Sequence, residues 1–281
     1  MLGLARYAMN GRRQAIVASM LSGMVPLLNL ISPAIVALVL LRQGGTAAMQ
    51  VAIWAVLPLL GWAWVGDLTP LILLLGVLPM AAVLRRTQSW QPALLVSLLV
   101  GAGSEVALRL RPGVLEQLQT QVGNFLAQSA ADQPEISAEL LQTTLISMFG
   151  VMHMMVVISC LIIARWWQAR LYNPGGFQAE FHALKLQPQV AGLLLLLFLL
   201  AGLGPTALAG WAIYFSLPLL VAGIALVHGL VKAKGWSGFM LVAFYLMLMS
   251  PPIMQIVAVF ALIDSFYDFR GRLTRGDDNE N

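Results

Sequence analysis

Long apolar stretches dominate this sequence, and short segments that carry arginine or lysine separate them. The clearest separator is residues 165–189 (RWWQARLYNPGGFQAEFHALKLQPQ), which lies between two apolar runs. Its charges, glycines and prolines are incompatible with a helix that crosses a bilayer. Arg165, Arg170 and Lys185 predict that it faces the cytoplasm, because basic loops of membrane proteins stay on that side. The side of the membrane on which every other connection lies then follows from the number of crossings that separate it from residues 165–189.

Composition supports this interpretation and excludes other classes of protein. Of the 281 residues, 59% are hydrophobic and 10% are charged, whereas soluble domains are about 25% charged. A water-soluble enzyme is therefore excluded. The net charge is +4, but the basic residues lie at the ends of apolar runs rather than on one face. This distribution argues against a nucleic-acid partner and predicts the lipid bilayer as the partner.

The predicted fold is all-α, a polytopic integral membrane helical bundle formed by residues 1–281 as a single domain. Two apolar runs contain prolines and are longer than one crossing. Residues 14–41 would span about 42 Å as one helix, against a hydrocarbon core of about 30 Å. We expect two short segments that meet near Asn29 and Pro33, and a similar pair around Pro251 and Pro252. The other expected segments are 46–65, 68–84, 91–108, 141–164, 190–209 and 211–231.

The positive-inside rule favours these split ends. With both ends folded back, all but two of the 16 lysines and arginines face the cytoplasm. The exceptions, Arg109 and Arg111, open an expected periplasmic amphipathic insertion at 109–140, in which apolar residues recur at helical spacing. The prediction is a bacterial inner-membrane protein of about eight to ten segments. Both termini are cytoplasmic, as are the loop 165–189 and the tail 270–281.

Polar residues at the broken segments and inside the helices are candidates for a ligand cavity. They are Asn29, Ser32, Arg42, Glu105 and His153. For Glu105 the alternative is an ion pair with Arg109, four residues later on the same helical face. For His153 the alternative to a ligand role is a hydrogen bond to a neighbouring helix. The methionines around His153 are largely consecutive and point around the helix, so no metal site and no cofactor are predicted.

Two further groups of residues are candidates for protein contacts. Ala15, Ser19 and Gly23 recur every fourth residue and form a small-residue face, which could dock a partner helix or pack within the chain. The second group is expected to interact on the cytoplasmic side, although such charges at a membrane boundary are usually a solvated anchor. It comprises Tyr172, Asn173, Pro174, Gly175, Gly176, Phe177, Asp264, Asp268 and Arg270.

The sequence also resembles two groups of membrane proteins. RLYNPGGFQAEFHALKL and the closing ALIDSFYDFRGRL resemble the YybS-like family of bacterial membrane proteins, over essentially the whole chain. ISPAIVALVLLRQGG, after the small-residue face, is similar to substrate-capture subunits of energy-coupling-factor vitamin transporters. That similarity implies that the face docks a membrane coupling subunit. This chain has additional C-terminal segments and no recognisable vitamin-binding motif, so no ligand residues carry over.

Two functions are therefore expected. The first is a capture or transport subunit for a small, vitamin-like or micronutrient-like molecule. The alternative is a non-transporting scaffold or assembly factor that acts through the cytoplasmic loop and tail. The sequence contains no nucleotide-binding loop, no Ser/His/Asp or Cys/His arrangement and no paired carboxylates, so we do not expect an enzyme.

Overall fold

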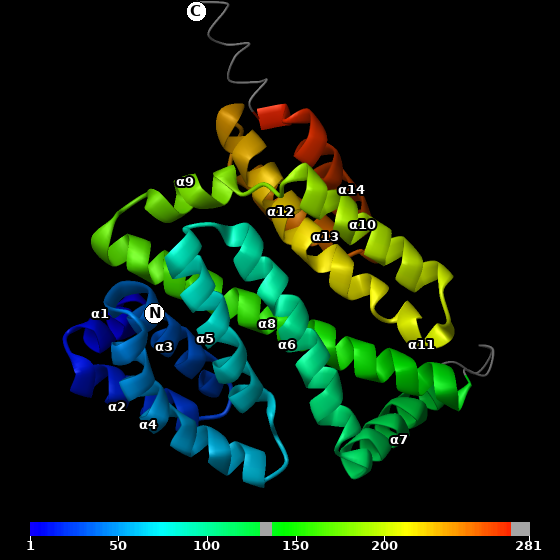
Figure 1. The fold of residues 1–281 in the computed structure, drawn as a ribbon, viewed down its shortest axis with the longest axis horizontal. Helices are drawn as coiled ribbons and strands as arrows, with labels where there is room; N and C mark the ends of the chain where they lie inside the picture. The colour runs from blue at the N-terminus through cyan, green and yellow to red at the C-terminus, as the bar shows by residue number, and fades with distance from the viewer. Residues whose placement is uncertain (130–136, 271–281) are drawn as a thin grey trace, which may run out of the picture. The chain divides into compact units, whose positions relative to one another are not determined.

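The computed structural model describes residues 1–129 and 137–270, and all regular secondary structure among them is helical. The predicted all-α class is therefore confirmed. The chain divides into two compact units, residues 1–173 and 174–281, and each unit is described by itself. Figure 1 shows the helices with their labels.

The helices of the first unit follow the apolar runs of the sequence. The predicted break near Asn29 is a turn and a short 3-10 helix, η1, at which Leu27 has a positive φ of 65°. Gly66 and Asp67 lie in the turn between the helices that correspond to the expected segments 46–65 and 68–84. The bounds are α1 Leu2–Met9, α2 Arg12–Met24, η1 Leu28–Leu30, α3 Ile31–Gln43, α4 Gly45–Trp64, α5 Thr69–Thr87, α6 Trp90–Arg109, α7 Pro112–Ser129 and α8 Ala138–Tyr172.

Helix α3 is the centre of this unit. Every residue from 32 to 41 is buried, because α2, α4, α5 and α8 all pack against it. A helix that is apolar on all sides is expected in such a core position. Residues 32–41 contain no charge, so each side of α3 suits contact with another helix.

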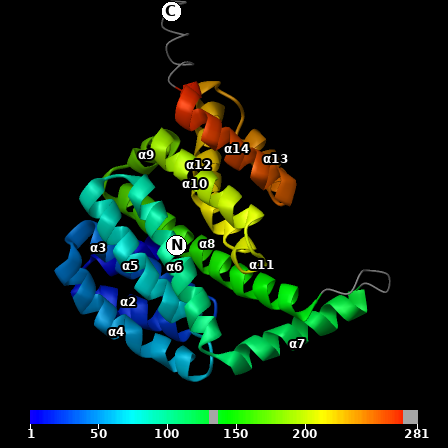
Figure 2. The same cartoon turned by 45° about the vertical axis from the view of Figure 1, so that its right-hand side comes forward.

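Helices α6 and α8 pack along each other, and α7 diverges from them in Figure 2. At the α6–α7 junction Leu108, Leu115 and Ile146 form a small buried cluster. Further along α7, Phe125 is exposed. The apolar spacing of residues 109–140 therefore corresponds to a real helix whose first turns pack on the unit, while residues 130–136 lie outside the described part.

In the second unit α12 is the central helix, with α10 and α14 packed beside it and α9 against one end. The proline-split end is again two helices, with a 115° bend between α13 and α14. The bounds are α9 Gly176–Ala183, α10 Pro188–Leu203, α11 Thr206–Ala209, α12 Ala212–Ala233, α13 Phe239–Leu248 and α14 Pro251–Tyr267.

By length and composition, five of the described helices are able to cross a membrane: α4, α5, α6, α8 and α12. The number becomes seven if the bent pairs α9–α10 and α13–α14 each count as one span. Helices α2 and α3 have 13 residues each, which is shorter than the roughly 20 residues of a full crossing. The eight to ten membrane segments expected from the sequence include short segments of this kind, and that number stays a prediction.

Two local features differ from the expectations. Residues 165–189 are mostly helical, because α8 continues to Tyr172 and α9 follows after three residues. Helix α1 was not anticipated, since its eight residues are too few for a crossing; Ala5 and Ala8 are nevertheless fully buried. Of the predicted tail 270–281, only Arg270 lies within the described residues.

Candidate functional site

One end of the first unit gathers basic and amide side chains around the last turn of α3. The Arg85 guanidinium donates hydrogen bonds to the carbonyl oxygens of Leu40 and Leu41, at 2.9 and 2.8 Å. The Gln168 amide donates to the Leu41 oxygen at 3.2 Å. The last carbonyls of a helix carry partial negative charge, and although Leu40 also accepts from the Gly44 amide, these side-chain contacts stabilise the end of α3. They also define a basic end of the first unit.

The five residues predicted to line a ligand cavity do not meet in one place. Arg42 is exposed at the basic end, where its guanidinium lies 4.1 Å from the centre of the Tyr172 ring. Glu105 is near the far end of α6, a helix that starts at Trp90, just after the basic end. Fifteen residues of helix span about 22 Å. Arg42 and Glu105 therefore lie too far apart to line one small cavity.

The other three candidates are buried. The His153 ring donates a hydrogen bond from Nδ1 to the Phe149 carbonyl oxygen, 2.7 Å away in its own helix rather than in a neighbouring one. Its Nε2 and the Ser32 hydroxyl are buried without a hydrogen-bond partner among the described residues. Asn29, in η1, is 5% exposed. Unpaired buried polar atoms are rare, so these two mark polar points in an apolar core.

Glu105 forms the ion pair that was the alternative to a ligand role, and the methionines spread around their helix as expected. The Glu105 carboxylate is 3.8 Å from the Arg109 guanidinium in the i, i+4 arrangement that the sequence indicated. Met154 is buried while Met152 and Met155 are exposed, so the methionines do point around α8. Among the described residues no three His, Cys, Asp or Glu side chains lie close enough to hold a metal ion.

The small-residue face of α2 packs within the chain. Ala15 is 2% exposed and Ser19 is fully buried. A Cβ atom added at Gly23 would lie 3.0 Å from Cγ of Pro58 and 3.3 Å from a methyl group of Leu59. The face is therefore buried within the chain, with α4 against Gly23, as expected for the alternative of internal packing.

On another side of the same two helices, α2 and α4 form a groove of about 650 Å³. Arg12 and Arg13 lie at its basic end, where the Arg12 guanidinium donates to the Gln50 side-chain oxygen at 3.0 Å. The other lining residues are Ile16, Val17, Met20, Ile53 and Trp54. The groove thus joins a cationic end to an apolar wall, and its volume is in the range of small-molecule sites.

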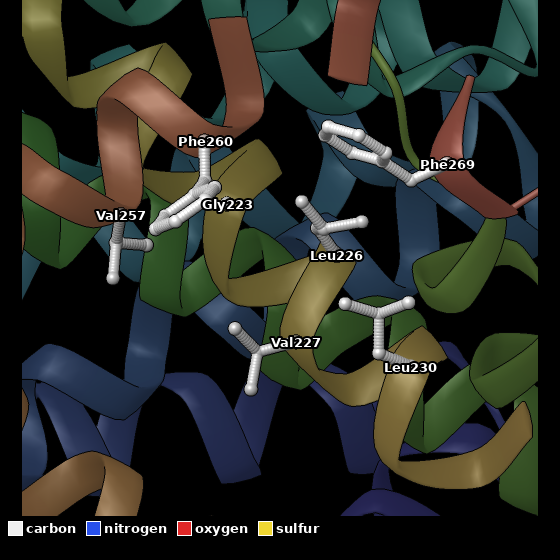
Figure 3. Close-up of a pocket in the computed structure, with 7 residues that line it drawn as sticks. All are labelled: Gly223, Leu226, Val227, Leu230, Val257, Phe260 and Phe269. Carbon is white, nitrogen blue, oxygen red and sulfur yellow. The ribbon is translucent and has the colours of Figure 1, made fainter. Parts of the chain in front are cut away.

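The second unit contains an apolar pocket of about 570 Å³ between α12 and α14. Figure 3 shows its lining, with four residues from α12, two from α14 and one from the chain just after α14. The residues are Gly223, Leu226, Val227, Leu230, Val257, Phe260 and Phe269. None of the predicted site residues lines this pocket or the groove.

The predicted acidic cluster of the C-terminal part is paired within the chain. Asp264 is 2% exposed, and the Arg270 guanidinium lies 2.8 Å from its carboxylate. The same guanidinium donates to the carbonyl oxygens of His182 and Leu184. Asp268 pairs with the Lys185 ammonium at 3.0 Å. The cation beside Asp264 is therefore Arg270, which follows α14, and the cation beside Asp268 is Lys185, which lies between α9 and α10 of the same chain.

The remaining predicted interaction residues, 172–177, lie where α8 ends and α9 begins. Residues 172–175 are exposed, and Gly175 adopts a left-handed conformation (φ 88°) that favours glycine. Phe177 stacks on Phe181 with ring centres 5.6 Å apart. The exposed part of this predicted surface is therefore confined to its first four residues.

The sequence did not predict the groove or the pocket, because their residues were interpreted only as topology markers and as parts of apolar helices. Arg12 and Arg13 served only as topology markers, although Ile16, Val17 and Met20 continue their helical face. Leu226, Val227 and Leu230 recur at three- and four-residue spacing after Gly223, which marks one face of a helix. That pattern alone does not distinguish a pocket from ordinary packing.

Comparison of this chain with protein-family models, with curated proteins and with solved structures finds no match.

Proposed function

We propose that this chain is a multi-pass protein of the bacterial cytoplasmic membrane, with both termini inside. The five long apolar helices support membrane insertion. Orientation is supported by the first unit, where Arg12, Arg85 and the Arg42–Tyr172 contact lie at the ends of helices that meet around the last turn of α3. Arg111 contacts the Gly66 carbonyl in the turn at the other end of α4 and α5. A concentration of arginines at one end is typical of the cytoplasmic side.

We further propose that the first unit captures or transports a small amphipathic anion. The observation that carries this proposal is the groove between α2 and α4, in which two arginines and a glutamine adjoin an apolar wall. Arg13 has no ion pair or hydrogen bond within the described part of the chain, so its charge is available to a ligand. A carboxylate or phosphate head fits the arginines, and a hydrocarbon tail fits Ile16, Ile53 and Trp54.

The test compares the double variant Arg12→Gln/Arg13→Gln with the wild type in nanodiscs of neutral phosphatidylcholine. The probe is a fluorescent long-chain fatty acid, titrated against the protein. Exposed charge contacts contribute about 0.2–1 kcal/mol each, so the double variant should bind about 2- to 30-fold more weakly. Native mass spectrometry of the purified wild type should also detect a co-purified anion.

The matched control is Arg6→Gln, because Arg6 is an exposed arginine of α1 that does not line the groove. Its affinity for the probe should equal that of the wild type. Equal affinity in the double variant, or equal weakening in both variants, would reject the groove as the site and leave only a general effect of charge.

A second candidate function is a membrane scaffold or assembly factor that acts through residues 172–177 and the tail. The exposure of residues 172–175 favours it, because an exposed connection rich in turn residues is accessible to a partner protein. Replacing Tyr172 and Pro174 by alanine should abolish partner capture in pull-downs from membranes under this hypothesis. Under the transport hypothesis it should leave fatty-acid binding unchanged.

A further inference from the structure

We infer that the pocket between α12 and α14 binds the end of a lipid acyl chain. This inference concerns the second unit alone and does not depend on the groove proposed for the first. It rests on the residues that bound the pocket at its two ends, on its lining and on its length.

The first end of the pocket is a close contact between the two helices. A Cβ atom added at Gly223 would lie 2.5 Å from the Val257 carbonyl oxygen and 2.6 Å from a methyl group of the Val257 side chain. Only glycine allows such an approach of two helix backbones. Beyond this contact the space between α12 and α14 is lined by Leu226, Leu230 and Phe260 rather than closed (Figure 3).

The second end is the phenyl ring of Phe269, and its position is fixed by buried polar contacts. Asp268 takes a left-handed conformation (φ 51°, ψ 61°) that ends α14 and redirects the chain. The Phe269 amide then donates to the Asp264 carboxylate at 2.9 Å. The Arg270 guanidinium donates to the same carboxylate and to the carbonyl oxygens of His182, in α9, and Leu184, just after α9. Phe269 is therefore held at the pocket by a paired and buried network.

The lining and the length of the pocket indicate which kind of ligand fits it. All seven lining residues are apolar, so the pocket offers no polar group that would orient a head group or a polar metabolite. From Gly223 to Leu230 is seven steps along α12, which is about 10 Å of helix. A partner helix is itself about 10–12 Å wide and needs an open groove along its length. A slot of this length, bounded by the helix crossing at Gly223 and by the Phe269 ring, suits a slender hydrocarbon chain instead.

The test uses the full chain in vesicles of dioleoylphosphatidylcholine that contain a phosphatidylcholine with a diazirine at the end of one acyl chain. After irradiation, mass spectrometry maps the labelled residues. We expect label on Leu226, Leu230 and Phe260, on the pocket faces of α12 and α14. Label that is instead spread evenly over exposed apolar residues of α14, such as Val259 and Phe266, would overturn the inference.

Two variants of equal chemistry sharpen this test. Val227→Phe fills the pocket, whereas Val259→Phe adds the same ring to the exposed face of α14, where Val259 is 52% exposed. Filling the space of one or two methylene groups should reduce pocket labelling by about 4- to 15-fold, and the control should retain it. Unchanged labelling in Val227→Phe would overturn the inference. If Val227→Phe loses its thermal unfolding transition, the double variant Leu226→Met/Val227→Leu replaces it, because it adds less volume to the pocket. Reduced labelling of the pocket would then support the inference, and unchanged labelling would overturn it.

Discussion

Among single residues, Asp264 links the end of α14 to the chain that follows it. Its buried carboxylate accepts from the Phe269 amide and pairs with Arg270. Removing one partner of a buried ion pair leaves the other charge uncompensated and costs about 3–5 kcal/mol. We therefore expect Asp264→Asn to lower the unfolding free energy of the protein in detergent by an amount in that range.

The control for this prediction is Asp268→Asn, which removes a similar charge four residues away. The Asp268 side chain is 55% exposed, and its partner Lys185 is 28% exposed. Pairs in contact with water contribute about 0–1 kcal/mol, so denaturant unfolding should show little change. An equal loss in both variants would contradict the assignment of Asp264 as the structural member of the cluster.

His182, in the last turn of α9, allows a prediction about how stability depends on pH. Burial lowers the pKa of its imidazole below 6.5, and the nearby cations Lys232, His228 and Arg270 lower this pKa further. The unfolded chain binds a proton near pH 6.5, while the folded protein keeps His182 neutral to a lower pH. This residue therefore makes no difference to stability above that pH and decreases stability as the pH falls below it.

The measurement is the midpoint of thermal unfolding between about pH 7.5 and 5, for the wild type and for His182→Gln. The carboxylates titrate in both proteins, so the difference between the two curves isolates His182. The variant should lose less of its thermal stability on acidification. Parallel curves would mean that His182 has the same pKa in the folded and unfolded states.

At the scale of helices, α3 depends on side chains from α5 and α8 for its last turn. Arg85→Met removes two hydrogen bonds from a cation to the Leu40 and Leu41 carbonyls, each of the kind that contributes about 1.5–3 kcal/mol when buried. Arg85 is exposed on the whole, so we expect a total loss of about 1–2 kcal/mol. Arg86→Met, an exposed neighbour for which the described residues provide no such bond, should change the unfolding free energy by less than about 0.5 kcal/mol.

The crossing of α12 and α14 makes a prediction about packing. Gly223→Ala places a methyl group 2.5 Å from the Val257 carbonyl oxygen, and such overpacking costs about 1–3 kcal/mol. In Gly103→Ala, by contrast, the new methyl group has no atom within 4 Å, and alanine is a better helix former than glycine by about 1 kcal/mol. Chemical denaturation should give opposite signs for the two variants, and the same sign would contradict the close crossing.

The helices themselves were the part of the fold most accessible from the sequence. The apolar runs 46–65 and 68–84 predicted both ends of α4 to within one residue and those of α5 to within three, and prolines marked both broken ends. The sequence could not show which side of α2 each neighbour covers, because small residues suit any close helix contact. Nor could it pair Arg270 with the carbonyls of His182 and Leu184, since partners more than 80 positions apart leave no local pattern.

For the whole molecule, the organisation into two compact units separates two kinds of site. The first unit has a groove with a cationic end, and the second has a pocket with only apolar lining. The polar residues expected to form one central cavity are instead spread along the first unit, from Arg42 at its basic end to Glu105 near the other. Ligand capture in this chain is therefore proposed at the helix surfaces rather than at a buried midplane.

The orientation of both units in the membrane is open to a direct test, because the chain has one cysteine, Cys160, which is 3% exposed. In a Cys160→Ser background, single cysteines are introduced at exposed positions near the ends of long helices. Val65→Cys and Leu203→Cys lie at the expected periplasmic ends, and Thr87→Cys and Trp236→Cys lie at the expected cytoplasmic ends. The arginine distribution predicts that a membrane-impermeant maleimide labels only the first pair in intact spheroplasts.

All four should react after detergent solubilisation, which controls for accessibility. Labelling of Thr87→Cys before lysis would reverse the first unit, and labelling of Trp236→Cys would reverse the second, so each unit is tested independently of the other.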